Sequence, residues 1–124
     1  MSVPILQQGR VLIASLQAEQ SDADLRRLNE ELLDGVARRR ATGVILDVSA
    51  VEVMDSYAVR SLRTVSYAAG LCGARAVVVG IQPGVAYAMT QLGITLEGIA
   101  TALDLDDGLI ELRQDRDREP AEPR

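Results

Sequence analysis

Two short, almost uninterrupted apolar runs limit what this chain can fold into. They are Val44–Val48 and Ala76–Gly80, and each follows a stretch with helical periodicity. Strands as apolar as these are suited to burial on both faces, which is typical of parallel sheets covered by helices. The chain therefore predicts an α/β domain whose sheet is covered on both sides.

A hairpin and a helix are predicted before the first of these runs. Val3–Gln7 and Arg10–Leu16 are apolar runs separated by a glycine turn, which predicts two antiparallel strands. Ser21, with Asp24 three residues later, predicts a helix that begins with a capping box. We expect Gly43 to end this helix, because glycine is the usual residue just past a helix C-terminus.

The last third of the chain predicts two further helices and a short strand. Pro83 suits the first position of a helix, because its fixed φ is already helical. Ile94–Ala100 predicts a short extended piece, and Thr101 with Asp104 predicts the start of the last helix. The resulting order ββαβαβαβα predicts a mixed sheet of four to five strands with right-handed crossovers.

One domain is expected, because 124 residues are enough for a single core. We expect this domain to span residues 1–113. Residues 114–124 are charged, contain two prolines and lack apolar periodicity, so they are predicted to be a disordered tail.

The composition argues against several classes of function. A net charge of −5 disfavours nucleic-acid and anionic-membrane partners, which would need a basic surface. No apolar run approaches the roughly 18 residues of a membrane span, so a cytoplasmic protein is expected. The chain has no histidine, no lysine and one cysteine, which removes the common catalytic triads, Schiff-base lysines and zinc sites. We therefore expect neither enzymatic activity nor a cofactor.

Acidic and hydroxyl side chains collect after the strand that begins at residue 44. Asp47, Glu52, Asp55 and Ser56 all fall at its carboxyl end, where function gathers in open α/β sheets. An aspartyl-phosphate receiver would need further early acids and a late lysine, which this chain lacks. Two interpretations of Ser56 remain, namely a helix N-cap and a phosphoacceptor that a partner recognises.

The helix predicted from Ser56 separates an apolar face from a polar stripe. Its apolar face consists of Ala58, Leu62, Val65 and Ala69. At about 100° per residue, the opposite face carries a narrow stripe of Ser56, Arg60, Arg63 and Tyr67. This stripe is either a solvated face or a binding surface, and tyrosine beside arginine is enriched in binding anchors.

Residues 44–56, Val-Ile-Leu-Asp-Val-Ser-Ala-Val-Glu-Val-Met-Asp-Ser, resemble the phosphorylation motif of the STAS domain, the anti-sigma-factor-antagonist family of bacteria. The likeness extends to about residue 113. Three further segments resemble the stressosome members of this family more specifically, namely Gly80-Ile81-Gln82-Pro83, Val85-Ala86 and Leu92-Gly93-Ile94. The short, single-domain form resembles the small scaffold protein of the stressosome.

The resemblance implies a STAS fold in which Ser56 is phosphorylated by a switch-protein serine kinase. It implies that the unphosphorylated chain, assembled with larger sensor-type STAS paralogues in a stressosome, sequesters that kinase. Phosphorylation would release the kinase, and a cognate phosphatase would reset the site. A homodimer and a large hetero-oligomer are expected. The expected partner-binding residues are Glu52, Asp55, Tyr57, Arg60, Arg63 and Tyr67.

Two departures from the family pattern refine this expectation. Tyr57-Ala58-Val59 follows Ser56, where direct antagonists of anti-sigma kinases usually carry a small residue and a glycine. This favours the scaffold over the direct antagonist. Ala88 matches the second acceptor threonine of the sensor paralogues and Thr90 is out of phase, so one phosphorylation site is predicted. The alternative of another class is a STAS subunit of a transport or lipid-trafficking complex, which docks without phosphorylation.

Overall fold

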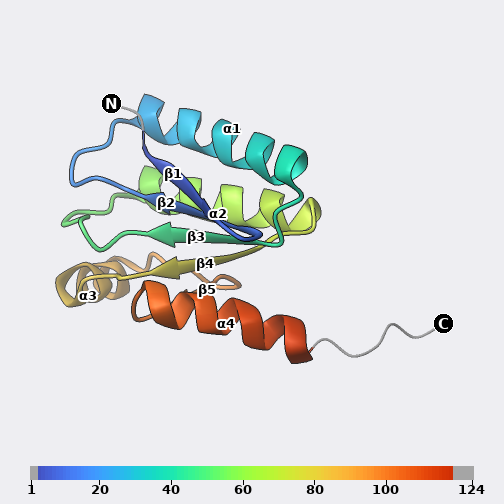
Figure 1. The fold of residues 1–124 in the computed structure, drawn as a ribbon. Helices are drawn as coiled ribbons and strands as arrows, with labels where there is room; N and C mark the ends of the chain where they lie inside the picture. The colour runs from blue at the N-terminus through green and yellow to red at the C-terminus, as the bar shows by residue number, and fades with distance from the viewer. Residues whose placement is uncertain (1–2, 119–124) are drawn as a thin grey trace.

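Strands and helices alternate along the chain in the predicted order (Figure 1). The structure is a computed structural model that describes residues 3–118. Its elements are β1 (Ile5–Gln8), β2 (Val11–Ser15), α1 (Asp22–Arg39), β3 (Gly43–Asp47), α2 (Ser56–Leu71), β4 (Arg75–Val79), α3 (Pro83–Leu92), β5 (Ala100–Ala102) and α4 (Leu105–Arg118).

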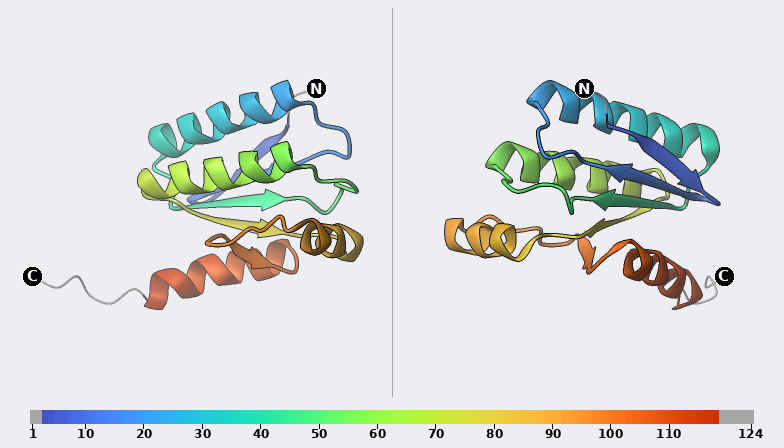
Figure 2. Two further views of the ribbon diagram at one scale, coloured as in Figure 1. Left: turned by 180° about the vertical axis from the view of Figure 1, so that it is seen from behind. Right: turned by 60° about the vertical axis from the view of Figure 1, so that its left-hand side comes forward.

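The five strands form one mixed sheet in the order β1-β2-β3-β4-β5. β1 pairs with β2 antiparallel, as the predicted hairpin requires, and the pairs from β2 to β5 are all parallel. Right-handed crossovers between successive neighbours place α1 and α2 on one face. Figure 2 shows α4 on the opposite face and α3 beyond the carboxyl end of β4. The predicted mixed α/β sheet is confirmed.

Side chains of β3 and β4 are buried on both faces of the sheet, as predicted. Val44, Leu46 and Val78 point toward α1 and α2 and join the larger apolar core. A smaller core lies under α4 and contains Ile13, Ile45, Val77, Val79 and Leu112. The two layers of helices are therefore a direct consequence of the apolar strands.

The start of α1 is as predicted, whereas its end is different. The Ser21 Oγ accepts from the Asp24 N–H, and the Asp24 carboxylate accepts from the Ser21 N–H, each at 3.0 Å. The bond from the Ser21 backbone contributes most to lowering the pKa of Asp24 to about 2. Arg40, with a φ of 52°, follows the last helical residue. The prediction that Gly43 ends the helix is wrong, because Gly43 is the first residue of β3. A Cβ there would lie 2.7 Å from a methyl group of Leu112.

The last strand and helix begin later than predicted. Thr101 lies within β5, where Ala100 pairs with Val77, so it does not open a helix. The Asp104 carboxylate instead accepts from the Asp107 N–H at 2.9 Å, at the start of α4. α4 continues through Arg118, so the boundary predicted at residue 113 falls inside a helix. Residues 119–124, the rest of the predicted tail, lie outside the described residues.

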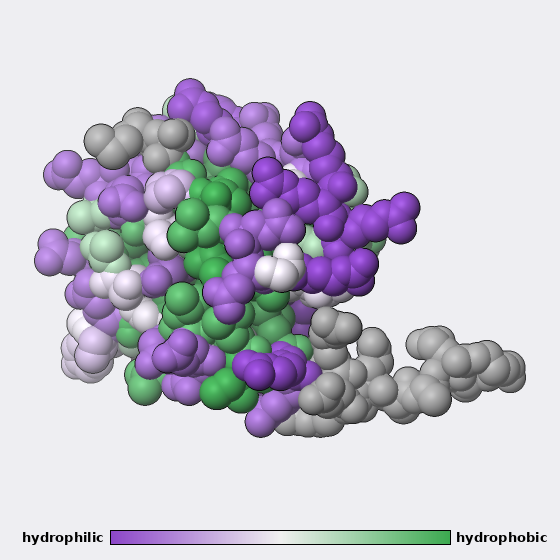
Figure 3. All heavy atoms as spheres, in the orientation of Figure 1, coloured by the Kyte–Doolittle hydropathy of each residue, from purple (hydrophilic) through white to green (hydrophobic). Residues whose placement is uncertain are grey.

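Part of the sheet face beside α4 is exposed. Figure 3 shows apolar side chains gathered near the middle of the face that carries the strands in Figure 1. Leu6 of β1 is 65% exposed, whereas Ile13 of β2 is buried. Within residues 3–118, none of the helices is long and apolar enough to cross a bilayer.

Gly108 of α4 generates a stability prediction. A Cβ at Gly108 would lie 2.7 Å from a methyl group of Val79, a buried β-branched side chain that cannot move aside easily. Gly108→Ala should therefore destabilise the fold by about 1–3 kcal/mol, the usual cost of overpacking. The matched variant Gly70→Ala has no atom within 4 Å of the new methyl group. It should stabilise the fold by up to about 1 kcal/mol. Urea denaturation of both variants measures the change in the free energy of unfolding. A change of the same sign in both variants would contradict this packing.

Candidate functional site

Ser56 is the first residue of α2, but it does not cap the helix. The N-cap is Asp55, whose carboxylate accepts from the Ala58 N–H at 2.8 Å and whose carbonyl accepts from the Val59 N–H at 3.1 Å. The interpretation of Ser56 as the N-cap is therefore wrong. The physical reason is the extended backbone of Asp55, which turns its carboxylate back over the first turn.

The Ser56 hydroxyl is exposed and makes no hydrogen bond within residues 3–118. The N–H groups of Ser56 and Tyr57 likewise have no acceptor in this part of the chain, as expected for the first turn of a helix. Arg60 lies one turn further on the same face of α2. A phosphate on Ser56 would thus meet two open N–H groups, the positive end of the helix and a guanidinium within reach.

The loop of residues 48–55, here called the acceptor loop, is anchored at its base. The Val48 N–H donates to the Val79 carbonyl at 2.9 Å and continues the β3–β4 ladder beyond β3. The Asp47 carboxylate accepts from both the N–H and the hydroxyl of Ser49, at 2.9 and 2.7 Å. Further along, Val51 and Met54 are buried. The chain leading to Ser56 is therefore held on the sheet.

The tip of the acceptor loop is exposed and contains an apolar residue that the sequence analysis missed. Glu52 is exposed, as expected of a partner-binding residue, and Val53 beside it is 81% exposed. The available signal was the crowding of Val51, Val53 and Met54 in four residues of loop. A short loop between a strand and a helix could not bury all three.

The predicted stripe of Ser56, Arg60, Arg63 and Tyr67 is exposed along its whole length. It extends for about 16 Å, given a rise of about 1.5 Å per residue. Tyr67 at its far end is 72% exposed. Arg63 also donates to the Thr95 carbonyl at 3.3 Å, which ties α2 to the segment before β5. Tyr57 differs from the other predicted partner-binding residues, which are exposed, because Tyr57 is half-buried and packs against the larger core.

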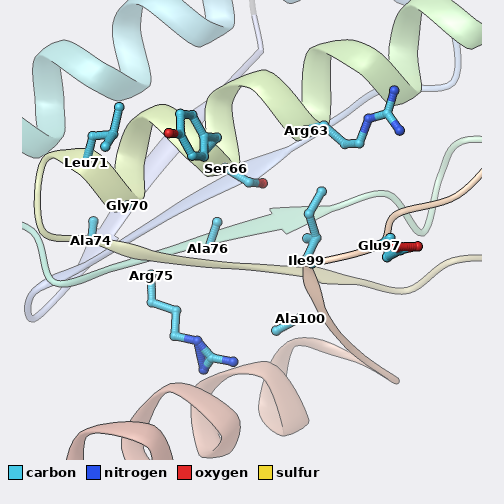
Figure 4. A pocket seen from close by; sticks show the side chains of 12 residues that line it. Arg63, Ser66, Gly70, Leu71, Ala74, Arg75, Ala76, Glu97, Ile99 and Ala100 are labelled. Atoms are coloured by element: carbon cyan, nitrogen blue, oxygen red, sulfur yellow. The ribbon is translucent and has the colours of Figure 1, made fainter.

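The far half of the stripe borders a groove of about 500 Å³ between α2 and the segment that leads into β5. Figure 4 shows Leu71 and Ser66 from α2 on one side and Ile99 with Glu97 on the other. Arg63 and Tyr67 belong to its lining. The exposed surface of α2 is therefore continuous from Ser56 to this groove.

Among residues 3–118, metal-ligating side chains do not cluster around Ser56. In the part of the chain that the structure describes, no group of three or more His, Cys, Asp or Glu residues is placed to hold a metal ion. The reactive groups at this site are the accessible hydroxyl of Ser56 and the exposed carboxylates of Asp55 and Glu52.

Comparison with known proteins identifies the family. The family model of the STAS domain matches residues 2–107. The chain belongs to the STAS-domain family. Among solved structures, this STAS domain is similar to a serine-to-glutamate variant of RsbS from Moorella thermoacetica. The two share 36% sequence identity with a TM-score of 0.80, over 93% of this chain and 97% of that one. The predicted fold and the predicted family are confirmed.

Two further relatives are a stressosome chain and a co-antagonist protein. A chain in a structure of the stressosome, described as a signal integration and transduction hub, is 35% identical with a TM-score of 0.74, over 94% of this STAS domain and 100% of that chain. The RsbT co-antagonist protein RsbRA of Bacillus subtilis is 31% identical over 98 residues, which is 79% of this chain and 34% of RsbRA. The chain thus spans about a third of the length of that curated relative.

The division of roles between Asp55 and Ser56 can be tested by stability alone. Asp55→Ala should destabilise the fold by about 1 kcal/mol, because the Ala58 N–H loses its acceptor. Ser56→Ala should change stability by less than about 0.5 kcal/mol, because the hydroxyl makes no hydrogen bond to residues 3–118 that would be lost. Urea denaturation at neutral pH measures both. A larger loss for Ser56→Ala than for Asp55→Ala would mean that the serine is the cap.

Proposed function

We propose that this chain is a non-enzymatic stressosome scaffold of the cytoplasm that sequesters a switch-protein serine kinase until Ser56 is phosphorylated. The observation that carries the proposal is the exposed Ser56 hydroxyl at the first turn of α2, next to a separate N-cap. Similarity to RsbS and to a stressosome chain, each over more than nine tenths of this chain, supports the assembly.

Phosphorylation of Ser56 is compatible with the fold. Asp55 supplies the cap, so the Ser56 hydroxyl can be modified without removing a bond that α2 needs. The phosphate would add about −1.5 to −2 charge beside the open N–H groups of the helix start, which stabilise anions. The modified chain would stay folded, and phosphorylation would change only the charge of its surface.

The same charge explains release of the kinase. A kinase that phosphorylates Ser56 must enclose the hydroxyl, so the phosphate is formed inside the interface between the two proteins. Glu52 and Asp55 add negative charge close to that point and raise the repulsion. An unpaired charge buried in an interface costs about 2–5 kcal/mol, which is roughly 30-fold to several thousand-fold in affinity.

The relatives support the assembly partners among those that we propose. Larger sensor-type STAS paralogues would build the hetero-oligomer together with copies of this chain, which the similarity to RsbRA and to a stressosome chain supports. A cognate phosphatase would remove the phosphate and restore kinase binding. The kinase is proposed to dock over residues 52–55 of the acceptor loop, over the exposed stripe of α2 and over the accessible part of Tyr57.

Phosphorylation and release are tested with the switch-protein serine kinase encoded nearest to this chain and with Mg·ATP. Intact-mass spectrometry should show one added phosphate on the wild type and on Thr90→Ala, and none on Ser56→Ala. In calorimetry, Ser56→Ala should bind the kinase as tightly as the unmodified chain. Ser56→Asp should bind at least about 30-fold more weakly. Equal binding by Ser56→Ala and Ser56→Asp would refute the release mechanism.

The docking surface has its own test. Arg60→Ala and Tyr67→Ala should each weaken kinase binding about tenfold or more, because exposed arginine and tyrosine are frequent binding anchors. Arg27→Ala is the matched control, since Arg27 is an exposed arginine on α1. Its dissociation constant should equal that of the wild type. Equal losses for Arg27→Ala and Arg60→Ala would point to a general charge effect and not to a surface on α2.

A further inference from the structure

Gln82 occupies the N-cap position of α3, but its side chain does not cap that helix. Its Nε2 instead donates to the carbonyl oxygen of Ser49 at 2.8 Å, across 33 positions of the chain. Ser49 belongs to the base of the acceptor loop. Glutamine is not among the residues favoured at N-caps, so its presence here is better explained by the contact it makes across to the other loop.

The surrounding backbone is arranged to allow this contact. Gly80 has a φ of +81°, and a Cβ on it would lie 2.8 Å from the Cβ and 3.2 Å from the Cα of Ser49. The turn after β4 therefore lies directly against the acceptor loop. Pro83 supplies a helical φ at the first position of α3 and has no N–H that needs a cap. α3 thus starts without a side-chain cap, and the side chain of Gln82 bonds to Ser49 instead.

Ser49 is consequently held from two strands at once. Asp47 at the end of β3 binds its N–H and hydroxyl, and Gln82 after the end of β4 binds its carbonyl. The segment that follows is short and packed, because Val51 donates to the Val48 carbonyl at 3.0 Å and Met54 is buried. A displacement at residue 49 would therefore be passed on to the helix start at Ser56.

We propose that Gln82 is a positioning residue for the phosphoacceptor, which it serves by fixing the base of the acceptor loop. The effect of Gln82 on phosphorylation rests on the proposed function, whereas its effect on the acceptor loop does not. A loosened loop would hold Ser56 in the binding geometry for a smaller fraction of the time. The apparent affinity of the kinase would fall in proportion to the fraction of molecules that hold this geometry. The rate of phosphoryl transfer within the complex would not change.

Gln82→Asn separates this role from helix capping. Asparagine is one methylene shorter, so its amide falls short of the Ser49 carbonyl, yet it is a favoured N-cap that should keep α3 and the melting temperature intact. Amide hydrogen exchange followed by NMR should become roughly two- to tenfold faster at Ser49 and Val51, the factor that loss of one neutral hydrogen bond gives. Gln91→Asn is the matched control, because within residues 3–118 the Gln91 side chain bonds to the Tyr87 hydroxyl of its own helix and to no other group.

The kinase assay gives the second readout. For Gln82→Asn the KM of Ser56 phosphorylation should rise, by no more than the factor by which exchange is accelerated, with kcat unchanged. Gln82→Glu should behave alike, since it keeps the length of the side chain but has no donor at neutral pH. Unchanged exchange and an unchanged KM for Gln82→Asn would overturn the inference, and so would an equal effect of Gln91→Asn.

Failure of this inference is distinguishable from failure of the proposed function. If the wild type is phosphorylated on Ser56 but the KM of Gln82→Asn is unchanged, only the positioning role is overturned. If the wild type is never phosphorylated, the proposed function is overturned. The exchange measurement, which needs no kinase, then still decides whether Gln82 holds the acceptor loop.

Discussion

Burial of β3 and β4 on both faces is the constraint on which the rest of this structure depends. Side chains that alternate between two apolar cores require helices on both sides, and right-handed crossovers assign α1 and α2 to one side and leave α4 for the other. Because the two strands are parallel neighbours, the chain leaves both at the same edge of the sheet. The acceptor loop and the turn that carries Gln82 therefore run side by side, although they are far apart in sequence.

At that edge, two adjacent residues divide tasks that one serine could not perform together. A helix that starts at an exposed edge needs a side chain to accept its open N–H groups, and Asp55 does so. A modifiable hydroxyl must stay accessible and unbonded, and that of Ser56 is exposed and has no hydrogen-bond partner in the described part of the chain. If the serine were the cap, each modification would disturb α2 as well as the surface. Under the proposed function, this separation would let Ser56 be phosphorylated without loss of the bond that caps α2.

Much of this arrangement could be predicted from local signals, namely the glycine turn of the hairpin, the capping box at Ser21, the apolar strands and the proline at the start of α3. What could not be predicted depends on distant contacts. Gly43 resembles a helix stop, but its small size is required by Leu112 of α4. Thr101 and Asp104 both resemble caps, and only the pairing of β5 with β4 decides between them. Likewise, the exposure of Val53 and the reach of Gln82 to Ser49 appear only when the loops are placed on the sheet.

The exposed side of α2 also has a consequence for the speed of encounter. α2 contains two arginines and no acidic residue, although the whole chain carries a net charge of −5. Arg60 and Arg63 make the exposed stripe of α2 locally basic in an acidic molecule, so it would attract an acidic partner surface, although Glu52 and Asp55 at the start of α2 reduce that attraction. The rate of association with such a surface would fall as salt is added, because screening acts over about 8–10 Å at physiological ionic strength. Dissociation, which depends on close contacts, would be far less sensitive to salt.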